Sequence, residues 1–491
     1  MNLVLITPGT GGYHCGVCMR DNALAKELIR QGHRAVMLPM YLPMTLDEEP
    51  APGAPMFFGG VSTYLREKWR VFRHMPRWLD RALNARWLLI LLAGRAAKTG
   101  GPEVAQMTLS MLRGEQGTQA GEIEELVAWL RVAFDGKKPD AVWLSTALQA
   151  GLARRIREAL GVPVIGFLQG EDSFLDGLGA ESPHVWSLLA DRMRDATVWV
   201  APSRYFAELM AKRLGYSADE AAQRIRVVPN GVAIPKQPPA LSQAPGKMPA
   251  GPTAGTAVSL LSPTIGYLAR FVPGKGIGLL VEAFILLKKR MPEARLRCAG
   301  SMTPDDARYV GTLKARLRTA GCEDAVEWLP NVSREEKQEF LAGLTVFSVP
   351  ATYSEAFGQY VIEALAAGVP VVLPRASAFP EIVEATGGGV LFDLGKTESE
   401  SAEALATALE QLLRDPAEAR SLGQRGCEIV RRDFSMALFA QRLVALTSSF
   451  SSAASPHEGP GRCHTNSHSA TGLSSPRPTW LASSTSRIST A

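Results

Sequence analysis

The chain has 491 residues, of which 46% are hydrophobic and 21% charged, and its formal net charge is +5. The length predicts two or three domains, and the composition is that of an ordinary soluble globular protein. A chain disordered throughout, a collagen and a membrane bundle are excluded, six Cys are too few for a disulfide scaffold, and the charge is too small to indicate nucleic acid as a partner.

Short apolar runs alternate with amphipathic segments along two halves of the chain, which predicts two domains with parallel sheets. We expect a helix over 21–31, and the strands of the first half fall at 2–7, 35–39, 141–145, 164–168, 198–201 and 226–228. Those of the second half fall at 264–268, 295–299, 326–329, 346–349 and 369–373. A Pro- and Gly-rich linker at 235–263 separates a domain at 1–234 from one at 264–430, and the Ser-rich tail 451–491 is predicted to be disordered.

The first strand runs into a glycine-rich loop that contains Gly12 and His14. Backbone N–H groups of such a loop can approach a phosphate at the start of a helix. The spacing is neither Gly-x-Gly-x-x-Gly nor a Walker loop, so dinucleotide and Walker interpretations both fail. Cys15 and Cys18 follow, but no second Cys pair completes a zinc site, and packing at the helix start explains them better.

Segment 66–98 carries nine Lys/Arg against two acidic residues, with Trp69, Trp78 and Trp87 interleaved. Basic and aromatic residues together suit a membrane surface or an anionic ligand, whereas a plain solvated helical face explains them equally. No apolar run of the chain reaches the roughly 18 residues needed to cross a bilayer, and the longest candidate, 87–93, is far too short. The N-terminus lacks the features of a signal peptide. We therefore expect a cytoplasmic protein, with 66–98 as the candidate for peripheral contact with the inner face of the membrane.

In the second half, Arg270 and Lys275 lie on a Pro- and Gly-containing loop that leaves the strand 264–268. Cations at the carboxyl end of a parallel strand are placed where an α/β sheet binds an anion. The alternative is a surface salt-bridge pair. The fixed loop around the two cations favours the anion site.

Two carboxylates, Glu355 and Glu363, lie eight residues apart, the first in a loop and the second two turns into the predicted helix. Together they can hold two ends of an extended polar ligand by accepting hydrogen bonds from its hydroxyls. Gly358 between them lets backbone N–H groups at the helix start meet a phosphate.

These motifs, with 201–203 and 228–232, resemble the retaining glycosyltransferases of family 4, which have the GT-B architecture of two Rossmann-like domains facing across a cleft. The resemblance covers about residues 1–445 and is most specific in the second half. It implies that the first domain holds the acceptor and the second holds the donor. It also implies that a helix at 431–450 crosses back to the first domain.

The resemblance assigns roles by position. Arg270, Lys275 and Glu355 would be the catalytic residues, the two cations neutralising the donor diphosphate and the carboxylate holding the sugar. Glu363 would take the ribose hydroxyls. The other donor-binding positions would be Gly12, Leu329, Phe357, Gly358 and Gln359.

The loop after the fourth strand departs from the family pattern. Many relatives have His-Gly-x-Asp after the fourth strand, where this chain has Gln169-Gly-Glu-Asp172. Gln cannot act as a base, but front-face departure of the leaving phosphate needs none. The resemblance leaves open which of Gln169 and Asp172 touches the sugar. His14 and Asn230 are the further candidates for sugar or acceptor contact.

The resemblance implies a transferase that moves a hexose from a nucleotide-diphosphate sugar to a glycan, glycolipid or small-molecule acceptor with retained configuration. It implies no metal, because GT-B enzymes lack the Asp-x-Asp clamp, and no nucleic acid partner. A sugar-nucleotide epimerase of the same architecture and an inactive nucleotide-sugar-binding protein stay open as alternatives. A nicotinamide oxidoreductase would need a dinucleotide fingerprint, which neither half contains.

Overall fold

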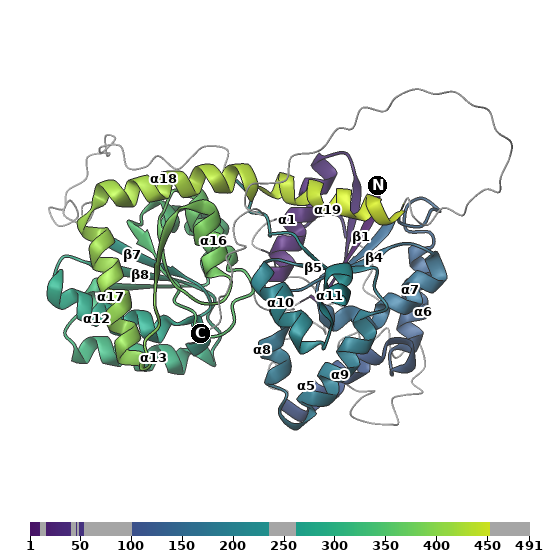
Figure 1. Cartoon of the computed structure of the whole chain (residues 1–491), viewed down its shortest axis with the longest axis horizontal. Helices are drawn as coiled ribbons and strands as arrows, with labels where there is room; N and C mark the ends of the chain where they lie inside the picture. The colour runs from purple at the N-terminus through teal and green to yellow at the C-terminus, as the bar shows by residue number, and fades with distance from the viewer. Residues whose placement is uncertain (10–15, 41–45, 47–48, 54–100, 235–261, 452–491) are drawn as a thin grey trace, which may run out of the picture.

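The computed structural model describes residues 1–9, 16–40, 46, 49–53, 101–234 and 262–451, which form two α/β domains bridged by two long helices (Figure 1). The basic segment 66–98 lies outside the described residues. So do residues 235–261 of the predicted linker and 452–491 of the predicted tail. Among the described helices, none has the length and apolar character that a membrane span requires.

The first domain contains a parallel sheet with strand order β2-β1-β3-β4-β5-β6. Its strands are β1 Asn2–Thr7, β2 Arg34–Pro39, β3 Ala141–Leu144, β4 Val164–Phe167, β5 Val198–Ala201 and β6 Ile225–Val227. Its helices are α1 Gly16–Arg30, α5 Gly101–Arg113, α6 Ala120–Leu130, α7 Ala153–Leu160, α8 Glu171–Asp176, α9 Ser182–Met193, α10 Arg204–Arg213 and α11 Ala218–Arg224. The central strands are buried on both faces because helices cover the sheet from both sides.

The second domain repeats the arrangement with strand order β12-β11-β10-β7-β8-β9. Its strands are β7 Thr264–Leu268, β8 Arg295–Gly300, β9 Val326–Pro330, β10 Val346–Phe347, β11 Val371–Pro374 and β12 Gly389–Phe392. Its helices are α12 Ile277–Arg290, α13 Asp306–Thr319, α14 Arg334–Ala342, α15 Gln359–Ala366, α16 Phe379–Thr386, α17 Glu398–Arg414 and α18 Pro416–Asp433. Two Rossmann-like parallel sheets therefore confirm the predicted fold.

The strands fall within two residues of the predicted positions, and the differences have local causes. The first helix begins at Gly16 rather than at residue 21, with Cys18, Arg20 and Asp21 already buried in its first turns. The strand β12 was not predicted. It is a four-residue edge strand that starts at a glycine and is only partly buried, so it has no continuous apolar run.

The predicted crossing helix 431–450 consists of two pieces. Helix α18 ends at Asp433, and α19 (Met436–Ser451) runs over the first domain (Figure 1). Between them Val232 N donates to Phe434 O at 2.8 Å and Met436 N donates to Val232 O at 2.9 Å. These two hydrogen bonds hold the residues between α18 and α19 against Val232, near the end of the first domain.

Close packing explains the Asn-Gly-Val motif next to that break. A Cβ built on Gly231 would lie 2.8 Å from Met436 Cα, so only glycine admits α19 at this distance. The helix buries Met436, Phe439 and Leu443 in the same core cluster as β1 and β3. The first domain is therefore completed by the last described helix of the chain.

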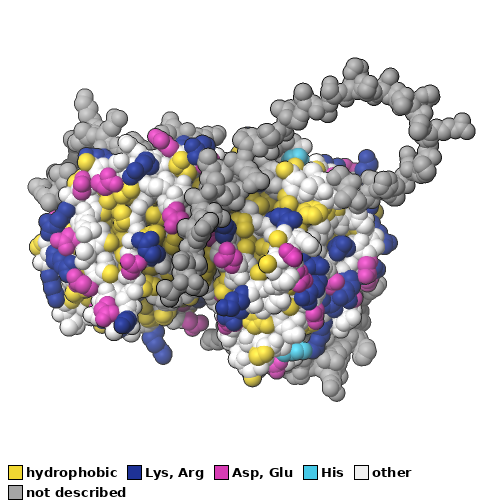
Figure 2. All heavy atoms as spheres, in the orientation of Figure 1, with side chains coloured by type: hydrophobic (Ala, Val, Ile, Leu, Met, Phe, Trp, Pro, Cys, Tyr) yellow, Lys and Arg dark blue, Asp and Glu magenta, His cyan; other side chains and the backbone are white. Residues whose placement is uncertain are grey.

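Lys/Arg and Asp/Glu side chains are interspersed over both domains on the face drawn in Figure 2. On that face the described residues present no broad region of one charge. This mixture agrees with the small net charge of +5.

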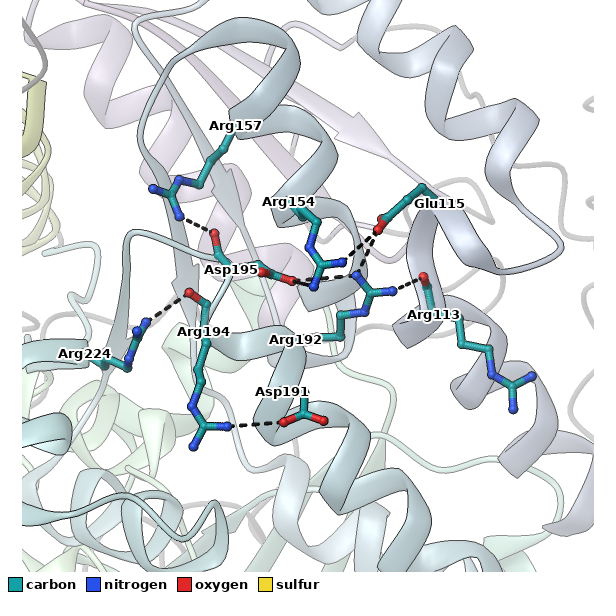
Figure 3. A network of polar contacts seen from close by, with 9 residues as sticks. All are labelled: Arg113, Glu115, Arg154, Arg157, Asp191, Arg192, Arg194, Asp195 and Arg224. Carbon is teal, nitrogen blue, oxygen red and sulfur yellow. Dashed lines mark hydrogen bonds and ion pairs between the residues drawn. The ribbon is translucent and has the colours of Figure 1, made fainter.

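A buried arginine ties three elements of the first domain together (Figure 3). Arg192 of α9 has a side chain only 4% exposed, and its Nη1 lies 3.0 Å from Glu115 Oε1. Its Nη2 donates to the carbonyl oxygen of Arg113 at the end of α5. Arg154 of α7 approaches the same Glu115 and pairs with Asp195 at 2.9 Å. Removal of Arg192 would leave Arg154 as the remaining cation of this network and would remove the hydrogen bond to the carbonyl oxygen of Arg113.

We predict that Arg192→Met destabilises the protein by about 1–3 kcal/mol, because the hydrogen bonds of the buried guanidinium to Glu115 and to the carbonyl oxygen of Arg113 are lost, while Arg154 still compensates the partly buried carboxylates. The control Arg194→Met removes a cation from the same helix region, but the Arg194 side chain is 39% exposed. Its cost should stay within about 1 kcal/mol. Urea denaturation followed by circular dichroism measures both. Equal midpoints for the two variants would show that the buried network contributes nothing.

Candidate active site

The strand order of the second sheet reverses between β7 and β10, and the predicted anion-binding residues gather at this point. Arg270 and Lys275 follow β7, and Glu355 follows β10. Open α/β sheets bind ligands in the crevice at the carboxyl ends of such neighbouring strands. The topology therefore brings Glu355 to the same edge of the sheet as Arg270, which lies 85 positions earlier in the sequence, and Lys275.

Lys275 and Glu355 form an ion pair in which Nζ lies 2.7 Å from Oε2. Glu355 is 8% exposed, and the hydroxyl of Tyr360 donates to the same carboxylate oxygen at 2.6 Å. Burial opposes the charge on Lys275, but Glu355 and Tyr353 together outweigh burial and raise the pKa of Lys275 above its usual value. Lys275 is therefore a cation at neutral pH, and its Nζ also lies 4.9 Å from the centre of the Tyr353 ring.

Arg270 is oriented by Asp306, a residue that the sequence did not single out. Its Nε and Nη2 donate to the two carboxylate oxygens of Asp306, each at 3.2 Å. Burial opposes the charge on Asp306, but hydrogen bonds from Thr303 and Arg270 lower the pKa of this carboxyl. The guanidinium is half-exposed, so it is held in place while still open to a ligand.

Glycines keep the loops of the site close together. Gly276 has φ +74°, and a Cβ there would lie 1.8 Å from Pro350 O, on the loop that leads from β10 toward Glu355. Gly358 has φ +84° and caps the start of α15, as the sequence predicted. A side chain at Gly276 would push the cation loop away from the carboxylate loop, and a Cβ on Gly358 would crowd Phe379 and Val361 at 3.1 Å.

Glu363 lies slightly more than one turn into α15, rather than two, because the helix begins only at Gln359. Its Oε1 lies 3.1 Å from Nζ of Lys337 on α14, another residue that the sequence did not single out. Leu329 is half-buried at the end of β9, and next to it Trp328 packs edge-on against Phe271 with ring centres 5.6 Å apart. Phe357 is buried and lies beside Phe434.

The residues predicted in the first domain are only partly described. Gly12, His14 and Cys15 lie outside the described residues. Cys18 is buried and its Sγ lies 3.4 Å from Thr7 Oγ1, which confirms packing for this cysteine. Asn230 is buried in the turn that meets α19.

The loop after β4 brings Gln169 and Asp172 to the side of the first domain that meets the second. Asp172 accepts a hydrogen bond from Ser354 of the second domain, and the backbone N–H of Gln169 donates to Glu171. Of the two residues that the sequence left open, Asp172 is the one with a side-chain contact across the cleft.

The two domains meet through polar contacts with backbone groups. Ser203 caps α10 by accepting from Phe206 N at 3.0 Å, and its hydroxyl donates to Ala356 O at 2.7 Å. Glu381 of α16 accepts from the backbone N–H groups of Arg204 and Tyr205 at the start of the same helix. A helix of one domain is thus capped by a carboxylate of the other.

We predict that Glu381→Ala loosens this contact, because two charge-assisted hydrogen bonds of about 1.5–3 kcal/mol each are lost. Small-angle X-ray scattering should give a larger radius of gyration than for the unchanged chain. The control is Glu384→Ala, which removes an exposed carboxylate from the same helix α16. Identical scattering from the two variants would rule out a closing role for Glu381.

Comparisons with known families agree with this geometry. The family model "Glycosyl transferases group 1" matches residues 259–428, and "Glycosyltransferase Family 4" matches residues 119–234. Together the two matched regions cover more than half of the chain. The chain belongs to the group 1, family 4 glycosyltransferases. The first region contains the cation loop, Glu355 and Glu363, and the second contains the loop of Asp172.

Relatives are distant, and most align over one part of the chain. An uncharacterized glycosyltransferase, YqgM of Bacillus subtilis, is 23% identical over 60% of this chain and 74% of its own length. A GDP-mannose-dependent phosphatidylinositol monomannoside mannosyltransferase of Mycolicibacterium smegmatis is 30% identical over 33% of this chain, and the alignment spans 42% of that relative.

The structure of HepE from Anabaena in complex with UDP-glucose has a TM-score of 0.58 and 15% identity, covering 91% of this chain and all of that one. At this identity the likeness establishes the GT-B fold and nothing finer.

Proposed function

We propose that this glycosyltransferase moves a hexose from a nucleotide-diphosphate sugar to an acceptor hydroxyl with retention of configuration at the anomeric carbon. The observation that carries the proposal is the pairing of Lys275 with Glu355 at the strand-order reversal, beside Arg270. A cation and a carboxylate at one point can hold the diphosphate and the sugar hydroxyls of one donor molecule. A GDP-mannose-dependent relative and a structural neighbour in complex with UDP-glucose support this donor class.

The charges of the site suit a departing diphosphate. Lys275 has three N–H donors, so it can contact a phosphate while it keeps its bond to Glu355. Arg270, held through Nε and Nη2 by Asp306, is a second fixed cation. Two preoriented cations stabilise charge that develops on the leaving group, so we propose that transfer needs no divalent metal.

The acceptor is proposed to bind against the first domain, opposite the donor. A glycan, a glycolipid or a small molecule with a free hydroxyl would serve. The basic segment 66–98 with its three Trp favours an acceptor at the cytoplasmic face of a membrane, where each Lys or Arg near anionic lipid adds about 1 kcal/mol.

The direct test is a screen of nucleotide sugars and acceptors, with the product analysed by proton NMR. We expect release of the nucleoside diphosphate together with a product whose anomeric configuration equals that of the donor. An inverted product would contradict the retaining mechanism. Formation of a free isomerised nucleotide sugar would instead indicate the epimerase.

Substitutions of the two carboxylates, Glu355 and Glu363, should impair different steps. We predict that Glu363→Ala weakens nucleotide binding by about 1.5–3 kcal/mol, because Glu363 faces the ribose in the proposed alignment. Glu355→Gln should mainly lower kcat, because Glu355 faces the transferred sugar. Calorimetry and steady-state kinetics separate the two effects, and Glu339→Ala, which removes an exposed carboxylate on α14, is the control. Unchanged nucleotide affinity in the Glu363 variant would show that the alignment is wrong.

A further inference from the structure

A cavity of about 550 Å³ opens at the amino-terminal end of the first sheet. Val162 and Pro163, which precede β4, and Thr197, which precedes β5, form part of its wall. The loops of the candidate active site follow the carboxyl ends of the strands, so the cavity lies at the opposite end of the sheet. Cavities of this volume accept small molecules. A ligand here would bind apart from the donor and its sugar.

The wall of this cavity is held in place by contacts within the first domain. Thr197 N donates to Val164 O at 2.8 Å, and Val164 N donates to Thr197 Oγ1 at 3.0 Å. Arg154 of α7 and Asp195 both line the cavity, and Arg154 Nη2 lies 2.9 Å from Asp195 Oδ2 (Figure 3). These two charges therefore compensate each other, and the cavity exists before any ligand binds.

Two further charges of the wall have no such compensation. Arg157 Nη1 donates to the carbonyl oxygen of Asp195 at 2.7 Å, which fixes the guanidinium without neutralising it (Figure 3). Among the described residues, its Nε and Nη2 have no partner. Such an edge of two N–H groups matches the two oxygens of a carboxylate.

Glu158 is the second uncompensated charge. It lines the cavity, is exposed, and forms no ion pair or side-chain hydrogen bond within the described part of the chain. It lies in the last turn of α7, where the helix dipole also favours a positive group. The wall thus presents one open site for a negative group and, on the adjacent residue, one for a positive group.

The rest of the wall is apolar and includes the last described helix. Val162 and Pro163 are buried, and the ring of Phe450 is partly buried at the end of α19. Phe450 packs against the core cluster that α1 and α19 share. Since α19 follows the crossing from the second domain, a ligand in this cavity would contact the crossing helix.

We propose that this cavity is a second binding site, which takes a zwitterionic ligand of the amino-acid class with an apolar side chain. Its carboxylate pairs with the Nε and Nη2 edge of Arg157, its ammonium group with Glu158, and its side chain packs on Val162 and Phe450. Glu158 opposes a simple anion and Arg157 opposes a simple cation, so the charges favour a ligand that carries both. Because binding adds contacts to α19, the ligand stabilises the packing of the crossing helix on the first domain.

The test is calorimetric titration of phenylalanine into the full chain without any nucleotide. Phenylalanine amide lacks the carboxylate and N-acetylphenylalanine lacks the ammonium group. We expect phenylalanine to bind, and each derivative to bind at least about fivefold more weakly. Arg157→Gln and Glu158→Gln should each lower the affinity for phenylalanine about fivefold. Both side chains are exposed, so circular dichroism should show unchanged folding.

The matched control is Arg155→Gln on the same helix, since Arg155 donates to Glu124 and does not line the cavity. Its affinity for phenylalanine should equal that of the unchanged chain. Absence of phenylalanine binding would overturn the proposal. Equal binding of N-acetylphenylalanine would show a simple anion site, and equal affinities of the three variants would place binding elsewhere, and either result would also overturn it. No nucleotide sugar enters this test, so its outcome is independent of the proposed transfer reaction.

Discussion

The ion pair of Lys275 with Glu355 is the interaction on which the site depends. The two residues come from loops that follow β7 and β10, and they meet because strand order reverses there. Each neighbour that we describe serves this pair: Tyr360 donates to the carboxylate, and Gly276 allows the cation loop to lie against the carboxylate loop. Either charge alone would be costly to bury, and together they form a pair without net charge.

The two domains contact each other largely through hydrogen bonds between polar side chains and backbone groups. Ser203, Glu381 and Gln359 each bind a backbone group of the opposite domain. Apolar side chains are buried across the crossing by α19, and Ala356 of the second domain is buried in the apolar core of the first. The connection at the crossing helices is therefore mainly apolar packing, whereas the contact at the cleft consists mainly of directional hydrogen bonds.

Much of the fold and half of the site could be predicted from the sequence, because the relevant signals are local. Buried parallel strands are continuous apolar runs, and Arg270, Lys275 and Glu355 lie in short motifs. Residues such as Asp306, Lys337 and Glu381 could not be predicted, since their roles come from partners that only the fold brings near. Glu171 was not singled out either, because two of its four hydrogen bonds come from Thr146 and Ala147, which follow the neighbouring strand β3.

The central claim is that a protein cation, oriented by a protein carboxylate, holds the donor diphosphate in place of a metal ion. Calorimetric titration of UDP and GDP into the unchanged chain and into Lys275→Met, with EDTA and then with Mg²⁺, tests it directly. We predict equal nucleotide affinity for the unchanged chain in both buffers and a loss of at least about tenfold in the variant. Binding that requires Mg²⁺, or that survives the substitution, would contradict the claim.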